Sequence, residues 1–222
     1  MTTPAAVWDA FTNPINDGPG QTWTHIRLSL FALALAAAIA VPSGLVLAKL
    51  GKAGSAVTTL TSGLGRAVPT FAVMALVAAL FTIGFWPAVV GLVLLGIPPI
   101  LLNTVVGIRE VDAGAVEASR GMGLTALQVM RKVELPLSLP LIFAGLRLSA
   151  NQVVATAALA GFVGAGGLGV IVQSGLFNGQ EDVLLAGAIP IAILAILAQL
   201  AISGVERVVS PKGLRLTRAA RR

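Results

Sequence analysis

The chain contains no cysteine and no tyrosine, and it has a single histidine among its 222 residues. Without cysteine, a disulfide framework and a thiolate metal site are both excluded. The one imidazole, His25, cannot build a metal site alone, because protein metal sites need three or four side-chain ligands. Its place at the entrance of an apolar segment predicts an interfacial polar anchor instead.

Charge is also scarce in this chain. Charged residues make up 11% of it and hydrophobic residues 56%, with a mean hydropathy of +0.93. Soluble domains carry about 25% charged residues, so this composition predicts a polytopic membrane protein. The net charge of +6 would suggest nucleic acid in a soluble protein. Here the basic residues gather between apolar runs and in a tail, so we expect membrane lipid and no nucleic acid as partner.

Long apolar runs make up most of the sequence. A helix needs about 20 apolar residues to cross the roughly 30 Å hydrocarbon layer, whereas β-barrel strands show shorter, alternating segments. The predicted fold class is therefore all-α, a polytopic bundle of five transmembrane helices. The predicted spans cover approximately residues 28–48, 56–81, 88–108, 137–160 and 184–205. Four prolines are expected to break the second, third and fifth spans: Pro69, Pro98, Pro99 and Pro190.

Lysine and arginine are unevenly distributed, and the positive-inside rule converts this distribution into an orientation. No lysine or arginine lies in residues 1–24, in the loop between the second and third predicted spans (residues 82–87), or in the loop between the fourth and fifth (residues 161–183). The other loops and the tail hold Lys49, Lys52, Arg109, Arg120, Arg131, Lys132, Arg207, Lys212, Arg215, Arg218, Arg221 and Arg222. We therefore expect an extracytoplasmic segment at 1–24, a transmembrane domain at 25–205 and a basic cytoplasmic tail at 206–222.

Two glycine-containing stretches match nucleotide-binding motifs without the required context. "GAGGLG" at 164–169 has the dinucleotide-binding spacing, but it follows a predicted membrane helix instead of opening a βαβ unit. "GLVLAKLGKAG" has a Gly-Lys pair but lacks the spacing and the Ser/Thr of a phosphate loop. We expect no ATP hydrolysis by this chain, and close backbone packing or a non-helical excursion at 164–169. An intramembrane enzyme is disfavoured, since no Ser/His/Asp or paired-carboxylate arrangement occurs in the predicted spans.

The apolar pattern is interrupted between Arg109 and Glu134, where eight of the 24 charged residues lie. Connections between bundle helices usually have two to eight residues, so this stretch is too long for a simple loop. Four apolar residues keep helical spacing within it: Leu124, Leu127, Met130 and Val133. They predict a short amphipathic helix that ends before Pro136 and presents a docking surface in the cytoplasm. A solvated loop is the alternative.

This interrupted stretch resembles the "EAA" loop of bacterial ABC importer permeases. The family pattern is E-A-A, three residues, G, nine residues, I, one residue, L-P, and the loop forms a coupling helix seated in a groove of the ATP-binding subunit. The resemblance implies a coupling loop at 109–136. It carries the ATPase-coupling role to Glu117, Ala118, Gly123, Leu135 and Pro136, with Ser119 and Val133 at the two substituted positions. Small residues at 118 and 123 would let another backbone approach closely.

Further stretches are similar to permeases for the osmoprotectants glycine betaine, carnitine and choline. They are "RAVPTFAV", "PPILLNTVVGIREVD", "EASRGMG", "KVELPLSLPLIFAGLR" and "GFVGAGGLG". The resemblance implies a type I ABC importer permease of the bacterial inner membrane, paired with an identical or related permease. Its implied partners are ABC ATPase subunits, which bind ATP and Mg, and an extracytoplasmic substrate-binding protein; no cofactor is expected in this chain.

Two rival functions stay open. "GRAVP" is also similar to methionine-importer permeases, so a methionine or amino-acid importer is the alternative within the class. A channel or carrier that needs no ATPase is the alternative from another class, and the EAA-like loop argues against it.

Polar residues near the predicted helix breaks are candidates for the translocation path, because transporters bind substrate near the midplane beside broken helices. They are Arg66, Pro69, Thr70, Asn103, Asn151 and Gln152. Arg66 could instead reach the cytoplasmic surface, as Arg147 is expected to do, and the two asparagines could make ordinary interhelical hydrogen bonds. Aromatic residues make up only 5% of the chain, and quaternary ammonium sites are built from aromatic rings. Selective capture is therefore expected on the binding protein.

Overall fold

The structure, a computed structural model, describes residues 2–209 apart from the side chain of Arg66, and within that range every regular element is helical. In chain order the elements are α1 (Pro4–Thr12), α2 (Gly18–Lys49), α3 (Gly51–Ala67), α4 (Thr70–Phe81), α5 (Phe85–Arg109), α6 (Ala113–Gly121), α7 (Ala126–Val129), the π-helical turn η1 (Met130–Glu134), α8 (Leu135–Thr156), the 3-10 helix η2 (Ala157–Val163), α9 (Gly169–Asn178) and α10 (Glu181–Val209). The all-α prediction is confirmed. Most of the predicted basic tail, residues 210–222, lies outside the described residues.

Four stretches are long and apolar enough to cross a membrane: α2, α5, α10 and the helix that runs from Ala126 to Val163. A bent pair, α3 with α4, makes a fifth, and its two parts enclose an angle of 93°. Pro69 causes the bend, since the residue before a proline is kept out of the helical region, and Val68 is extended (φ −84°, ψ 123°). The predicted bundle of five spans, with its break at Pro69, is confirmed when the bent pair counts as one span.

The other predicted breaks are wrong. α5 continues through Pro98 and Pro99, and α10 continues through Pro190. A membrane helix tolerates proline where neighbouring side chains supply the missing donors. Next to the α5 prolines, two side chains add further bonds to the backbone: the Ser149 hydroxyl of α8 donates to the carbonyl of Gly96 (2.8 Å), and the Asn103 amide donates to that of Pro99 (2.8 Å).

α5 is the central helix of the bundle and packs against both α2 and α8. Within its most apolar 18-residue window, 61% is buried inside the chain, against 17% for α10. Close approach needs a glycine here: a Cβ built on Gly145 of α8 would lie 2.7 Å from the Asn103 Cβ and 2.9 Å from the Pro99 carbonyl oxygen. The core at this junction includes Leu28, Ala32, Ala36, Ala40, Leu92, Ile100 and Val153.

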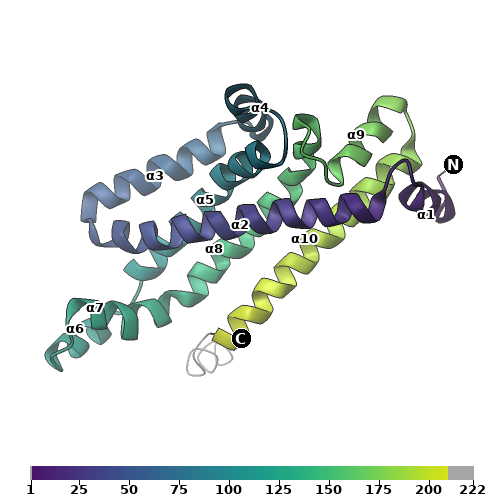
Figure 1. Cartoon of the computed structure of the whole chain (residues 1–222). Helices are drawn as coiled ribbons and strands as arrows, with labels where there is room; N and C mark the ends of the chain where they lie inside the picture. The colour runs from purple at the N-terminus through teal and green to yellow at the C-terminus, as the bar shows by residue number, and fades with distance from the viewer. Residues whose placement is uncertain (1, 210–222) are drawn as a thin grey trace.

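The spans run between two ends of the molecule, one carrying α1 and α9 and the other carrying α6 and α7 (Figure 1). At the α1–α9 end, residues 164–168 form no helix, which confirms the predicted non-helical excursion. The Gly167 amide donates to Gln21 Oε1 of α2 (2.7 Å). His25 is fully buried, with its Nε2 3.0 Å from the carbonyl oxygen of Val154, so its prediction as an interfacial anchor is wrong.

Two polar contacts tie α8 to α10. Arg147 forms an ion pair with Glu206 near the C-terminal end of α10, and the expected extension of Arg147 to the membrane surface stays a prediction. One helical turn further along, the Asn151 amide donates to Gln199 Oε1 (3.3 Å), which confirms the interhelical hydrogen bond considered for this asparagine.

Replacing Gly145 by alanine should destabilise the bundle, because the new methyl group would force α8 away from α5. Overpacking of this kind costs about 1–3 kcal/mol. The matched control is Gly204→Ala in α10, where a Cβ meets nothing within 4 Å of the described chain. The measurement is the temperature at which each purified variant loses its monodisperse peak in size-exclusion chromatography. Equal temperatures for the two variants would contradict the close-packing argument.

Candidate functional site

The first part of the predicted coupling loop is the helix α6, which begins at a well-formed cap. Asp112 Oδ1 accepts a hydrogen bond from the Ala115 amide (2.8 Å). Glu117 and Ala118 are exposed, whereas Ser119 is 2% exposed and its hydroxyl donates to the Val116 carbonyl (2.7 Å). The EAA-like triplet therefore presents two residues outward and turns the third inward.

The turn after α6 depends on Gly123, which has a positive φ of +83°. The Gly123 amide donates to the Arg120 carbonyl (2.9 Å), and the Leu124 amide donates to the Ser119 carbonyl (3.3 Å). These two bonds define a Schellman motif, the ending that glycine favours because it has no Cβ to clash in the left-handed region. A side chain at 123 would meet open space, so within this chain the glycine serves the backbone conformation.

A capping box starts the next helix, and sequence reasoning missed the pattern that predicts it. Thr125 Oγ1 accepts from the Gln128 amide (3.4 Å), and Gln128 Oε1 accepts from the Thr125 amide (2.8 Å). The spacing T-x-x-Q is the signature of a reciprocal helix start. Glycine at 123 and threonine at 125 thus end one helix and begin another within three residues.

The predicted short helix that ends before Pro136 is wrong. Helix continues from α7 through η1 into α8, and the Leu135 amide donates to the Met130 carbonyl in the five-residue pattern of a π-helical turn. Pro136 is the second residue of α8 and directly follows the π-helical turn, so the residue without an amide donor falls where the regular hydrogen-bond pattern already changes. The separate short helix is α6, and the second half of the stretch belongs to a membrane span.

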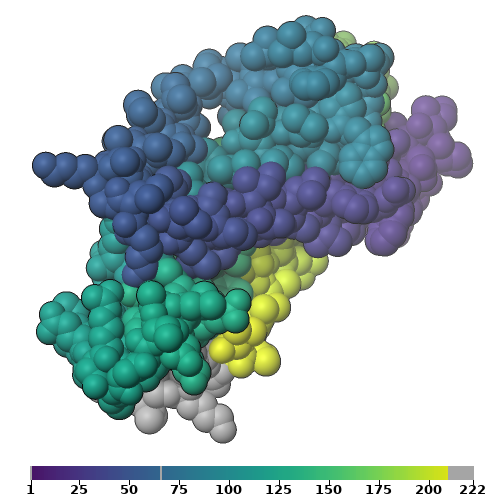
Figure 2. Space-filling view, turned by 60° about the vertical axis from the view of Figure 1, so that its left-hand side comes forward, coloured from purple at the N-terminus to yellow at the C-terminus, as the bar shows by residue number. Residues whose placement is uncertain are grey.

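α6 contacts both α7 and η1, and together these elements form a lobe that projects from one end of the molecule (Figure 2). The structure brings Glu117, Ala118 and Gly123 to its surface, while Val133, Leu135 and Pro136 lie half-buried along the following helix. Two apolar residues of the lobe are strongly exposed, with Met122 73% and Leu127 59% exposed.

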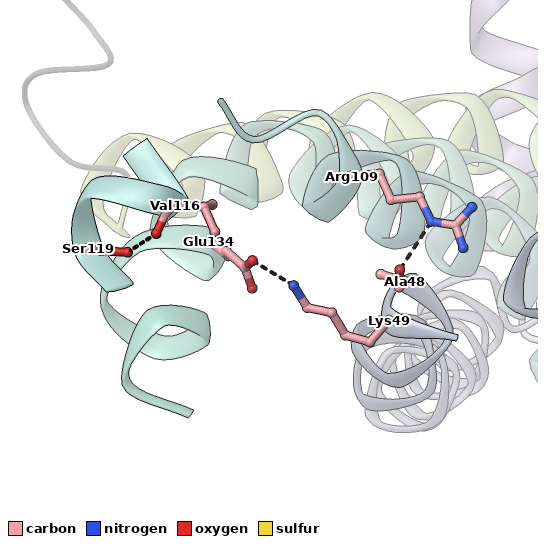
Figure 3. Close-up of polar contacts among 6 residues, drawn as sticks. All are labelled: Ala48, Lys49, Arg109, Val116, Ser119 and Glu134. Atoms are coloured by element: carbon pink, nitrogen blue, oxygen red, sulfur yellow. Dashed lines mark hydrogen bonds and ion pairs between the residues drawn. The ribbon is translucent and has the colours of Figure 1, made fainter. Parts of the chain in front are cut away.

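Glu134, at the only unspecified position between Val133 and Leu135 in the family pattern, links the lobe to the membrane helices. It is 4% exposed, and its carboxylate forms an ion pair with Lys49 Nζ at 2.6 Å (Figure 3). Lys49 is the last residue of α2. Sequence reasoning missed this pair because the partners are 85 residues apart.

Arg109, at the end of α5, holds the turn between α2 and α3. Its guanidinium donates to the carbonyl oxygen of Ala48 (3.2 Å; Figure 3), to those of Leu47 (3.2 Å) and Gly51 (2.9 Å), and also to the Ser55 hydroxyl. The final carbonyls of a helix have no intrahelical donor, and a cation at that end is favoured by the helix dipole. Arg109 therefore fixes the end of α5 against the end of α2.

A pocket of about 230 Å³ lies between α3, α5 and α8, and we call it the polar pocket. It is lined by Ser62, Gly65, Leu95, Pro98, Pro99, Leu102, Asn103, Leu148 and Gln152. The Ser62 hydroxyl is buried and has no hydrogen-bond partner in the described structure. A buried hydroxyl in this state calls for a water molecule or a ligand group. An apolar hollow between α3, α4 and α5 adjoins the pocket and shares three of its lining residues.

The structure brings two of the predicted path residues, Asn103 and Gln152, into the polar pocket. Pro69 is exposed at the α3–α4 bend with Thr70 beside it, and neither lines the pocket. Asn151 instead faces α10 through its bond to Gln199. Arg66 lies on α3, and its side chain falls outside the described residues.

Comparison with known proteins identifies near relatives along almost the whole length. The chain is 41% identical over 198 residues to the carnitine transport permease protein OpuCB of Listeria monocytogenes, covering 89% of this chain and 90% of that protein. It is 37% identical over 194 residues to the glycine betaine/carnitine/choline transport system permease protein OpuCB of Bacillus subtilis, covering 87% and 89%.

The architecture is shared with transporters of known structure. A chain of the MetNI methionine ABC transporter, in an inward-facing conformation, matches with a TM-score of 0.72 at 27% identity, covering 85% of this chain and 94% of that one. The five-span bundle described above is thus an ABC importer permease fold. The model of the binding-protein-dependent transport system inner membrane components matches residues 40–213, and the chain belongs to this family.

Proposed function

We propose that this chain is the membrane permease of an ATP-driven importer for quaternary-ammonium osmoprotectants, the class to which glycine betaine, carnitine and choline belong. The observation that carries the proposal is the 41% identity to a carnitine permease over 89% of the chain. The permease forms the translocation path for the substrate. Separate ATPase subunits bind ATP with Mg and hydrolyse the ATP. Two permease subunits, identical or related, and an extracytoplasmic binding protein complete the importer.

The lobe formed by α6, α7 and η1 is the proposed contact with the ATPase. Exposed Glu117, Ala118, Met122 and Leu127 offer a mixed apolar and charged surface, and interfaces commonly place methionine and other apolar groups at their centre. The Schellman turn at Gly123 keeps α6 folded back on the helix that follows. The ATPase-coupling role thus falls to Glu117, Ala118, Ser119, Gly123, Val133, Leu135 and Pro136.

Two routes carry a movement of the lobe into the membrane. The first is covalent, because α7 continues without a break through η1 into α8. The second is the ion pair between Glu134 and Lys49, which connects the lobe to the end of α2. Arg109 then joins the C-terminal end of α2 to α5, so the proposed movement of the lobe reaches α2, α5 and α8.

A methionine or amino-acid substrate is the second candidate. The match to the methionine transporter at a TM-score of 0.72 favours it, but its 27% identity is lower than that of the osmoprotectant permeases. Fold similarity alone does not determine a substrate, since one architecture serves many ligands. The identity difference makes osmoprotectants the primary proposal.

The proposed orientation places the lobe in the cytoplasm and the α1–α9 end outside. The chain has no native cysteine, so single cysteines at Asn178 and Leu127 can be labelled without background. Both positions are exposed. We expect an impermeant thiol reagent added to intact cells to modify Asn178→Cys and to leave Leu127→Cys unmodified until the membrane is opened. The reverse pattern would overturn the orientation.

Met122→Glu should uncouple the permease from its ATPase, because an unpaired carboxylate at an interface must be desolvated. We expect substrate-stimulated ATP hydrolysis in reconstituted vesicles to fall by at least about tenfold, equivalent to roughly 1.4 kcal/mol. The matched control is Val208→Glu, which places the same charge at an exposed apolar residue of α10 outside the lobe. Undiminished stimulation in a well-inserted Met122→Glu variant would remove the lobe from the ATPase contact.

Substrate class is tested with the complete importer in proteoliposomes. We expect ATP-dependent uptake of radiolabelled glycine betaine or choline, competed by unlabelled carnitine and indifferent to methionine, because the identified relatives handle quaternary ammonium compounds. A complex reconstituted without ATPase subunits is the control and should show no uptake. Uptake of methionine with no uptake of any quaternary ammonium compound would establish the second candidate.

A further inference from the structure

Three phenylalanines that are far apart in the sequence meet near the α1–α9 end, and we call them the aromatic row: Phe71, Phe162 and Phe177. They come from α4, η2 and α9. The rings of Phe71 and Phe162 lie 5.9 Å apart at 90°, and those of Phe162 and Phe177 lie 6.3 Å apart at 71°. All three remain accessible, at 51%, 38% and 71% exposed.

The backbone around the central ring is closely packed. The Gly84 amide donates to the Val163 carbonyl (2.9 Å), which fixes η2 against the turn between α4 and α5. A Cβ on Gly161 would lie 2.8 Å from the Val170 amide nitrogen, so η2 also packs tightly on α9. The row is therefore centred on η2, which contacts both α4 and α9, and its rings keep a defined arrangement.

The central ring of the aromatic row shares a helix face with one residue of the polar pocket. Gln152, which lines the pocket, and Phe162 belong to one continuous helix from Ala126 to Val163. With 3.6 residues per turn in α8 and 3.0 in η2, the positions of Phe162 and Gln152 differ by roughly 20° of rotation about the helix axis. Phe162 lies roughly 17 Å further along that axis. The change from α to 3-10 winding is what aligns them.

This side of the bundle is not suited to face lipid. Ser62, Asn103 and Gln152 are polar groups at membrane depth, and the Ser62 hydroxyl is buried without a partner. Polar groups in hydrocarbon are unfavourable unless they line a water-filled cavity or meet a partner. The helix face that carries Gln152 and Phe162 is thus best explained as part of the substrate path.

On the basis of the proposed function, we propose that the aromatic row is the outer station of that path and contacts the quaternary ammonium group by cation–π interaction. A cation within about 6 Å of an aromatic face is attracted by the ring quadrupole, and quaternary ammonium groups are a known use of this interaction. Edge-to-face packing of the three rings leaves faces available for such a contact. The polar pocket, one station further inward, offers hydroxyl and amide groups to the rest of the substrate.

The experiment uses the complete importer in proteoliposomes, with radiolabelled glycine betaine delivered by its loaded binding protein. Phe162→Leu keeps apolar bulk but removes the ring, and Phe162→Tyr keeps the ring. We expect Phe162→Leu to lower the turnover number by roughly 2- to 30-fold, the range of a cation–π contact, with an unchanged half-saturating concentration of loaded binding protein. Phe162→Tyr should retain most of the turnover. Phe31→Leu, in a separate aromatic cluster with Phe85 and Trp86, is the matched control and should behave as wild type.

Stepwise fluorination of phenylalanine at position 162 separates electrostatics from shape, because fluorine weakens the ring quadrupole with little change in size. Turnover should fall progressively with each fluorine. Equal turnover across the fluorinated series, or equal loss in the leucine and tyrosine variants, would overturn the proposal. A raised half-saturating concentration of loaded binding protein with normal turnover would assign the row to binding-protein docking. Dissociation of the Phe162→Leu importer into subunits would assign the row to subunit packing. Either result would overturn the proposal. Failure of the unmutated importer to take up any quaternary ammonium compound would instead refute the proposed function itself.

Discussion

The close approach of α5 to α2 and α8 is the constraint on which the rest of the structure depends. In a membrane, lipid tails are as apolar as leucine, so helices associate through tight packing and a few polar contacts. Gly145 lets α8 come within van der Waals contact of Asn103, and the Ser149 hydroxyl bonds to the backbone of α5 beside its prolines. The polar pocket forms where α3 is held against the other face of this junction.

The same three helices converge at the end that carries the lobe, and two charged side chains connect them there. Arg109 binds carbonyl groups at the end of α2, and Lys49 of α2 pairs with buried Glu134 at the start of α8. A charge as buried as Glu134 is strongly unfavourable without its partner, so the ion pair constrains where the lobe can sit. The fold thereby joins the proposed ATPase contact to the core by covalent and electrostatic links.

Sequence patterns were most reliable where a local rule acts alone. The apolar runs predicted the spans, and Pro69 predicted the bend, because a proline restricts the residue before it whatever surrounds them. The predicted breaks at Pro98, Pro99 and Pro190 failed because a membrane helix can continue through a proline, and α5 and α10 do so. The helix predicted to end before Pro136 failed for a similar reason, as a π-helical turn carries it into α8.

The sequence by itself determined that this is a five-span membrane protein with an exposed, charged lobe, because hydrophobic run length and short-range motifs act on adjacent residues. It also contained the Schellman glycine and the capping box that shape the lobe. Only the tertiary structure decided which distant residues come together: Lys49 pairs with Glu134, Phe71 packs against Phe162, and Ser62 and Gln152 line one pocket. Such pairings depend on helix rotation and crossing, and a few degrees of rotation or one turn of 3-10 helix changes which side chains share a face.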